Sequence, residues 1–120
     1  MGGSYKELRV WQFAMELVFR IYAVTPAFPK QELYGLVSQM QRAAVSIVSN
    51  IAEGKGRTSN KEFAHFLSNA RGSLHELETQ VMVAAHLKYI NEEVEKELLD
   101  RMADIGRMLT GLTTFAAAQS

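Results

Sequence analysis

Apolar residues recur every three or four positions along most of the chain, which is the period of one face of an α-helix. Four such segments cover residues 5–25, 31–53, 59–89 and 92–116. Their apolar stripes are Trp11, Ala14, Leu17, Val18, Ile21 and Tyr22; Leu36, Val37, Met40, Ala44, Ile47 and Ile51; Phe63, Leu67, Ala70, Leu74, Leu77, Val81 and Ala84; and Val94, Leu98, Met102, Ile105, Leu109 and Leu112. The pattern predicts an all-α fold, an up-down-up-down antiparallel four-helix bundle, in one domain over residues 1–120.

Capping and helix-breaking residues stand at the predicted helix ends. They are Ser4 with Glu7, Pro26 and Pro29, Gly54, Ser59 with Glu62, and Asn91. Gly72 lies inside the third segment, where a glycine costs about 1 kcal/mol of helix propensity, so we expect it to mark a close helix crossing. The small, neutral C-terminal sequence TTFAAAQS is expected to fray.

The second predicted helix carries too little charge for the outside of a monomeric bundle. Between residues 33 and 52 the only charged residue is Arg42. If Met40 and its stripe face the core, Ser38, Arg42, Val45 and Ser49 lie on the opposite side. Such a small, nearly neutral strip predicts a subunit interface at Ser38, Val45 and Ser49. The alternative is that this helix is buried within its own bundle.

Polar residues form two further stripes at helical spacing. They are Gln39, Arg42, Ser46, Asn50 and Glu53 on the second predicted helix, and Asn69, Ser73, Glu76 and Gln80 on the third. These side chains either hydrogen-bond across the helix pair or line a groove. Cross-helix hydrogen bonding is the favoured interpretation, because buried polar ladders more often specify packing than bind ligands.

The charge of the chain is balanced overall but not evenly distributed. Thirteen basic residues face thirteen acidic ones. Through Arg71 there are nine Lys and Arg against five Asp and Glu, and from Gly72 onward four against eight. This permits a locally basic face on a protein that is not generally basic. The absence of cysteine fits a reducing, cytoplasmic location, and neither a secretory signal nor a membrane-spanning segment is expected.

The sequence offers little for catalysis or metal binding. Glu62 and His65 have the Glu-x-x-His spacing of di-iron bundles, but the second pair that such a site needs is absent from the sequence. His75 and His86 share a helix face but are about 16 Å apart, too far to share an ion. A nucleophile motif is also absent. We therefore predict a non-enzymatic protein with no cofactor and no metal site.

The segment SNIAEGKGRTSNKEF, residues 49–63, has the residue types of a phosphate-binding loop without the required spacing or strand. Helix capping explains Gly54, Gly56, Ser59 and Glu62. The cluster of Lys55, Arg57 and Lys61 beside a helix N-terminus is left over, and such an arrangement attracts phosphate. A solvated turn is the alternative.

Several stretches together resemble the 23S rRNA-intervening-sequence protein family of small bacterial four-helix bundle proteins. They are VWQFA at residues 10–14, FPKQELYGL at 28–36, RAAVSI at 42–47, NIAEGKGR at 50–57, EFAHFL at 62–67 and GSLHELETQ at 72–80. The resemblance implies a homopentameric ring of bundles, similar to the accessory protein of diversity-generating retroelements, whose ring is basic and binds nucleic acid.

The sequence and the resemblance together support a leading hypothesis and a rival. The leading hypothesis is an oligomeric helical bundle that binds structured RNA or DNA through Lys55, Arg57 and Lys61, with Arg42 and Arg71 as further candidates. The rival is a protein-interaction or scaffold bundle that touches no nucleic acid and receives a partner helix in its grooves. A bundle that binds a small molecule or a metal is a third reading. The sequence leaves open which nucleic acid is bound and what the biological role is.

Overall fold

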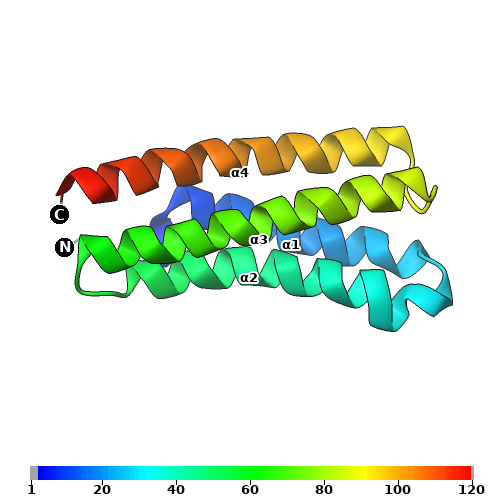
Figure 1. Cartoon of the computed structure of the whole chain (residues 1–120), viewed down its shortest axis with the longest axis horizontal. Coiled ribbons are helices and arrows are strands. Elements are labelled where there is room, and N and C mark those ends of the chain that lie inside the picture. The colour runs from blue at the N-terminus through cyan, green and yellow to red at the C-terminus, as the bar shows by residue number, and fades with distance from the viewer. Residues whose placement is uncertain (1–2, 120) are drawn as a thin grey trace.

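A computed structural model describes residues 3–119, and these residues form four long α-helices with no strand among them. The helices are α1 (Arg9–Val24), α2 (Ser38–Lys55), α3 (Asn60–His86) and α4 (Glu92–Gln119). They lie side by side along the long axis of a molecule that measures 46 × 23 × 20 Å (Figure 1). The all-α prediction is confirmed, and the arrangement is that of a helical bundle. Within the described residues, the helices are all too short or too polar to cross a lipid bilayer.

The chain path in Figure 1 places the α1–α2 and α3–α4 connections at one end of the bundle and the α2–α3 turn at the other. Helix α2 packs against α1 and α3, and α4 packs against α3 and α1. Each helix therefore has two neighbours and one solvent-facing side. This geometry separates the two sets of connections by the length of the bundle.

The core consists of one apolar stripe from each helix, as the spacing predicts. Its largest fully buried side chains are Leu17, Ile21, Met40, Ile47, Ile51, Leu67, Leu77, Val81, Leu98, Met102, Ile105 and Leu109. Burial of such side chains stabilises a fold by roughly 1.5–3 kcal/mol each. Tyr22, which the pattern assigns to the α1 stripe, is instead 46% exposed.

The first predicted helix is shorter at its start than the range 5–25. Residues Tyr5–Glu7 form a 3-10 turn, and α1 begins at Arg9. The Ser4 hydroxyl accepts a hydrogen bond from the backbone N–H of Lys6, at 3.1 Å. Ser4 therefore caps the short turn and not a longer α-helix.

The start of the second predicted helix also differs from the expected range 31–53. Residues Lys30–Glu32 form a 3-10 turn and Leu33–Val37 a π-helical segment in which Gly35 has non-helical angles, φ −114° and ψ −109°. One Glu32 carboxylate oxygen accepts from the backbone N–H of Leu36 (3.2 Å) and the other from the Tyr89 hydroxyl (2.9 Å). Glu32 thus holds this irregular segment against the turn before α4.

The prediction that Gly54 ends the second helix is wrong. Helix α2 continues through Lys55, and Gly56 closes it by donating its N–H to the carbonyls of Ala52 and Glu53. Gly54 is buried, and a methyl group added to it would lie 2.6 Å from Cβ of Phe66. This glycine is therefore required by the close approach of α2 to α3, not by the helix end.

The third and fourth predicted helices differ less. Helix α3 ends at His86 rather than at residue 89, because Lys88 adopts a left-handed conformation with φ 67°. Helix α4 continues beyond residue 116 to Gln119, so the C-terminal segment that was expected to fray is helical. Gly72 is exposed, with no atom within 4 Å of an added methyl group, so the close crossing predicted there is absent.

The two glycines give a matched stability test. Gly54→Ala places a methyl group against the Phe66 Cβ, and we expect it to reduce the free energy of unfolding by about 1–3 kcal/mol. Gly72→Ala meets open space in a helix interior and should raise that free energy by roughly 0.5–1 kcal/mol. Urea unfolding followed by circular dichroism measures both. Equal stability of the two variants would contradict the close α2–α3 contact.

An ion network joins α1 to α4 on the opposite side of the bundle from the α2–α3 contact. The Arg20 guanidinium donates to both carboxylate oxygens of Glu97, each at 2.6 Å. Arg101 donates to Glu97 at 3.0 Å and to Glu16 at 3.5 Å. Hydrogen bonding to Arg20, with further help from Arg101, lowers the pKa of Glu97 from 4.5 to about 2.

This network gives the fold an acid-sensitive component. A carboxylate whose pKa is lower in the folded state stabilises the fold above the unfolded-state pKa of 4.5, and that contribution is lost as the pH falls toward about 2. The Glu97 side chain is one third exposed, which reduces the contribution to roughly 1–2 kcal/mol. Glu97→Gln should lower the unfolding free energy by that amount at neutral pH, and the difference from wild type should shrink below pH 4.5.

The control for this prediction is Asp100→Asn. Asp100 accepts from Lys96 at 2.7 Å in a pair that is mostly exposed, so the change should cost less than about 0.5 kcal/mol. Denaturant titrations across the acid range measure all three proteins. A Glu97→Gln deficit that stays constant down to the lowest pH would contradict the role given to this carboxylate.

Candidate nucleic-acid interface at the turn between α2 and α3

The α2–α3 turn brings two of the predicted cations to the rim of one small pocket at the end of the bundle. Lys55 is the last residue of α2, and Arg57 follows Gly56. The pocket has a volume of about 250 Å³ and is lined by Gly3, Gly54, Lys55, Arg57, Ser59, Asn60 and Phe63. The polar residues of its lining are Lys55, Arg57, Ser59 and Asn60. This set of donors suits an oxyanion.

The N-terminus of α3 forms the other side of this pocket. The Ser59 hydroxyl accepts from the backbone N–H of Glu62 at 3.1 Å, which confirms the predicted cap. Lys61 lies in the first turn of α3 and is exposed. Of the three cations predicted to cluster, Lys55 and Arg57 line the pocket, and Lys61 lies just beyond it.

The predicted cations differ in whether a carboxylate already binds them. Arg57 donates to Glu53 at 2.9 Å, and its guanidinium stacks 4.6 Å from the centre of the Phe66 ring. The other four, Arg42, Lys55, Lys61 and Arg71, contact no carboxylate within residues 3–119. On α4, by contrast, Lys96, Arg101 and Arg107 are all ion-paired. Helices α2 and α3 therefore carry cations that remain available to an external anion.

Arg42 and Arg71 do not join the cluster at the turn. Arg42 precedes Lys55 by thirteen residues of α2, or about 20 Å, and Arg71 follows Lys61 by ten residues of α3, or about 15 Å. Arg42 lines a groove between α2 and α3 together with Gln39, Ser46 and Glu76. Arg71 lines the groove between α3 and α4. The five predicted residues thus divide into three separate places.

The polar stripes of α2 and α3 meet, as the favoured interpretation required. The hydroxyls of Ser46 and Ser73 are 2.8 Å apart, and the Asn50 amide donates to Ser46. Gln80 is buried and donates to Glu76 at 3.4 Å, while its Oε1 is buried without a hydrogen-bond partner in the described part of the chain. The two stripes are therefore joined by one direct hydrogen bond among the described residues, between Ser46 and Ser73. Gln39 of the α2 stripe and Glu76 of the α3 stripe line the Arg42 groove instead.

The predicted subunit-interface residues lie beside an exposed apolar surface that the sequence pattern did not identify. Val45 is 39% exposed, and on α1 Phe19 and Tyr22 are 62% and 46% exposed. The Gln41 amide donates to the Thr25 hydroxyl at 3.1 Å, and Val45 and Tyr22 each lie one turn from this contact. Phe19 was detectable in principle, because it is an aromatic residue outside the buried stripe of α1.

We name this surface the α1–α2 face and define it by Phe19, Tyr22, Ser38, Val45 and Ser49. Ser49 is exposed and Ser38 half-buried. None of the five side chains is charged. The face therefore combines two exposed aromatic rings with an absence of charge, and enrichment in aromatic residues with depletion of charge distinguishes protein interfaces from the rest of the surface.

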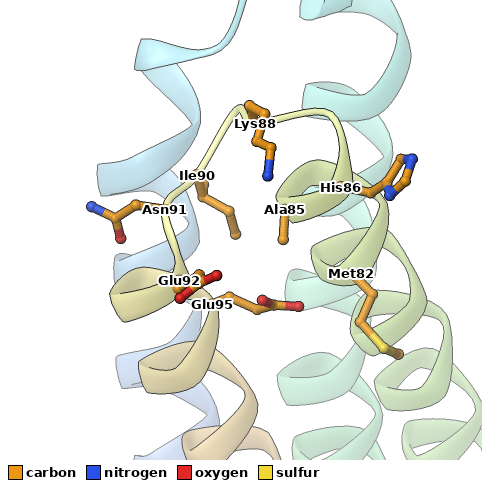
Figure 2. Close-up of a pocket in the computed structure, with 8 residues that line it drawn as sticks. All are labelled: Met82, Ala85, His86, Lys88, Ile90, Asn91, Glu92 and Glu95. Carbon is orange, nitrogen blue, oxygen red and sulfur yellow. The ribbon is translucent and has the colours of Figure 1, made fainter.

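A larger pocket than that at the α2–α3 turn, with a volume of about 520 Å³, lies at the α3–α4 turn, which no pattern in the sequence indicated as a site (Figure 2). Figure 2 shows the Lys88 side chain directed into the space between Ala85 and Ile90, with the carboxylates of Glu92 and Glu95 on the opposite side. Asn91 points away from the space and caps α4 by accepting from the N–H of Val94 at 2.8 Å, as predicted. Because Lys88 is positive and Glu92 and Glu95 are negative, this pocket does not favour one class of ligand.

The described residues contain no group of three or more His, Asp or Glu side chains placed to hold a metal ion. Hydrogen bonding to Arg20 lowers the pKa of Glu97, and a hydrogen bond to Glu32 raises the pKa of Tyr89. What the α2–α3 turn offers is therefore fixed positive charge and hydrogen-bond donors.

Comparisons with known proteins agree with this bundle geometry. A crystal structure of a protein with unknown function from the S23 ribosomal protein family of Bacteroides thetaiotaomicron VPI-5482 superimposes with a TM-score of 0.81. The match covers 87% of this chain and 97% of the other at 22% sequence identity, which establishes the shared fold. The curated proteins include no match to this sequence. The family model for the 23S rRNA-intervening sequence protein matches residues 6–111, and the chain therefore belongs to that family.

Proposed function

We propose that this protein is a non-enzymatic, cytoplasmic, up-down-up-down four-helix bundle that assembles as a homopentameric ring and binds RNA or DNA through cations at the α2–α3 turn. The observation that carries the proposal is the convergence of Lys55 and Arg57 on one pocket, with Lys61 next to it and Lys55 and Lys61 both free of carboxylate partners within residues 3–119. Neutralising a phosphate with such a cation releases counterions and gives binding that weakens with salt.

The family description supports RNA as the first ligand to test. It refers to an intervening sequence of 23S rRNA, and the similar crystal structure carries the name of a ribosomal protein family. A fragment of structured ribosomal RNA is therefore the natural probe, with duplex DNA of equal length beside it. Contacts to phosphate do not depend on sequence, so both should bind if the turn alone makes the contact.

Assembly of several copies would strengthen a contact that is weak in one copy. A single turn offers three cations, one of which is already paired with Glu53. When copies are linked, the second and later contacts become intramolecular, and the overall affinity rises without any new contact. The uncharged α1–α2 face supports the assembly part of the proposal, because its exposed aromatic rings would be covered by a second copy.

The same face also favours the second candidate function, a scaffold that binds another protein and no nucleic acid. Phe19 and Tyr22 are the kind of aromatic side chains that dominate protein–protein interfaces. The two candidate functions differ in how the binding affinity depends on salt concentration. Binding through phosphates falls steeply with salt, whereas binding through the apolar face does not.

The nucleic-acid proposal predicts the behaviour of a triple variant, Lys55→Gln with Arg57→Gln and Lys61→Gln. Fluorescence anisotropy with labelled RNA and DNA should give binding to the wild type at low salt and at least a roughly tenfold weaker affinity for the variant. The slope of log K against log salt should be shallower by about one for each phosphate that the variant no longer neutralises.

A matched control for the triple variant is Lys30→Gln, since Lys30 is exposed, lies at the other end of the bundle and has no ion pair within residues 3–119. This variant should bind both nucleic acids as the wild type does. Equal weakening in the control, or unchanged binding in the triple variant, would refute the assignment to this turn.

The assembly proposal predicts the effect of a charge at the centre of the α1–α2 face. Light scattering after size-exclusion chromatography should give about 67 kDa for the wild type, five times the chain mass of 13.4 kDa. Val45→Arg should shift the protein to the monomer, because an unpaired buried charge costs several kcal/mol at an interface. Thr114→Arg, on the exposed side of α4, should leave the mass unchanged. A monomeric wild type would exclude the ring.

A further inference from the structure

The groove between α3 and α4 holds a second group of basic side chains, well separated from the α2–α3 turn. Its volume is about 390 Å³, and Arg71 and His75 of α3 face Arg107 of α4 across it. Between them the lining includes the small residues Ala103 and Gly106 of α4. Basic groups therefore flank the groove on both sides, and Glu78 of α3 lies with them.

Arg71 is the arginine of this group with no carboxylate partner within residues 3–119. Its side chain is half-buried beside the helix pair, and residues 3–119 provide no ion pair or hydrogen bond to its guanidinium. The arginines Arg20, Arg57, Arg101 and Arg107 each contact a carboxylate. Partial burial of an unpaired cation is unfavourable, and an external anion that binds there would remove the penalty.

The formal charges around the groove cancel at neutral pH. Arg107 is paired with Asp104, and Glu78 lies in the groove with Arg71. Two positive groups therefore oppose two negative ones. His75 is the remaining ionisable group in the lining, and histidine is the side chain that gains a proton between about pH 8 and pH 5. Protonation of His75 makes the groove net positive.

All three histidines of the chain lie on α3, and they share its outer side. His65, His75 and His86 are separated by ten and eleven residues, close to three helical turns each, and all are exposed. Helix α3 also contains two other basic residues, Lys61 and Arg71, and three acidic ones, Glu62, Glu76 and Glu78. Its formal charge is therefore −1 with neutral histidines and +2 with all three protonated.

The surroundings of the three histidines differ, and this singles out His75. His65 contacts the ring of Phe66 and lies one turn from Lys61 and Glu62. His86 lines the pocket at the α3–α4 turn, which also contains Lys88 and the carboxylates of Glu92 and Glu95, and Figure 2 shows its ring directed outward. His75 shares its groove with two arginines and with Glu78, so it is the histidine whose pocket brings together arginines from both helices.

We propose that the groove between α3 and α4 is a second phosphate-binding site, made by Arg71, His75 and Arg107, which binds nucleic-acid phosphate when His75 is protonated. The Thr110 hydroxyl, which also lines the groove, is a further donor to a phosphate oxygen. This inference rests on the proposed nucleic-acid function and extends it. The bound strand would contact the α2–α3 turn and then cross the exposed side of α3, where Gly72 leaves the surface uncovered.

The experiment measures the salt dependence of RNA and DNA binding at about pH 7.5 and about pH 5.5 by fluorescence anisotropy. For the wild type, the slope of log K against log salt should become steeper at the lower pH, by about 0.7–0.9 for each added phosphate contact. His75→Gln and Arg71→Gln should each remove this added contact, so that the slope of each variant is the same at both pH values.

His86→Gln is the matched control, because it removes a histidine from the same side of the same helix but from a pocket with two carboxylates. It should keep the full change of slope. Glu78→Gln provides the opposite test. It removes the carboxylate that opposes Arg71, so the additional contact should already be present at about pH 7.5.

The possible failures are distinguishable. If wild type binds nucleic acid with the same slope at both pH values, or if His75→Gln and Arg71→Gln retain the change of slope, the groove is not a phosphate site and the proposed function stands. If wild type binds no nucleic acid at either pH, both proposals are wrong. Inorganic phosphate added at constant ionic strength should leave the bound oligonucleotide in place. If inorganic phosphate displaced the oligonucleotide, the groove would be a site for free phosphate, and its assignment to nucleic acid would be wrong.

Discussion

The close contact between α2 and α3 at Gly54 and Phe66 fixes the end of the bundle on which the candidate site depends. Because Gly54 has no side chain, α2 approaches α3 near the turn and continues as a helix to Lys55. The short connection then places the Arg57 guanidinium over the Phe66 ring. Phe66 therefore packs against Gly54 and also positions Arg57. The packing of the helix pair and the placement of the cations are consequences of the same contact.

The two sides of the bundle use their charges differently. On the α1–α4 side, Arg20 and Arg101 converge on Glu97, and the ion network joins two helices that pack less extensively than the other neighbouring pairs. Helices α2 and α3 are joined by apolar packing and by the Ser46–Ser73 bond, which need no charge. The arginine and lysine residues on α2 and α3, namely Arg42, Lys55, Lys61 and Arg71, make no ion pair within residues 3–119 and remain available to a ligand.

The helices themselves could be predicted from the sequence. A helix that buries one face needs an apolar residue every three or four positions, and buried residues such as Leu17 and Met102 follow that spacing. The helix ends were less predictable, since one residue type serves several purposes. Gly54 suits a helix end and a close contact equally well, and only the position of Phe66 distinguishes them. The π-helical segment around Gly35 likewise depends on Glu32 bonding to Tyr89, a residue 57 positions away.

The candidate site was predictable only where its residues are close in sequence. Lys55 and Arg57 are two residues apart, so their proximity follows from the sequence. The proximity of His75 to Arg107 does not, because Arg107 belongs to another helix.

The acidic first turn of α4, with Glu92, Glu93 and Glu95, lies at the opposite end of the bundle from the cationic α2–α3 turn (Figure 1). A chain with no net charge is therefore an electric dipole along its long axis. In a ring whose subunits are parallel, like ends lie next to one another and repel, and dissolved salt screens that repulsion. For the ring and the nucleic-acid binding proposed above, salt would therefore favour assembly and weaken the contacts to phosphate, so binding would be strongest within a window of ionic strength.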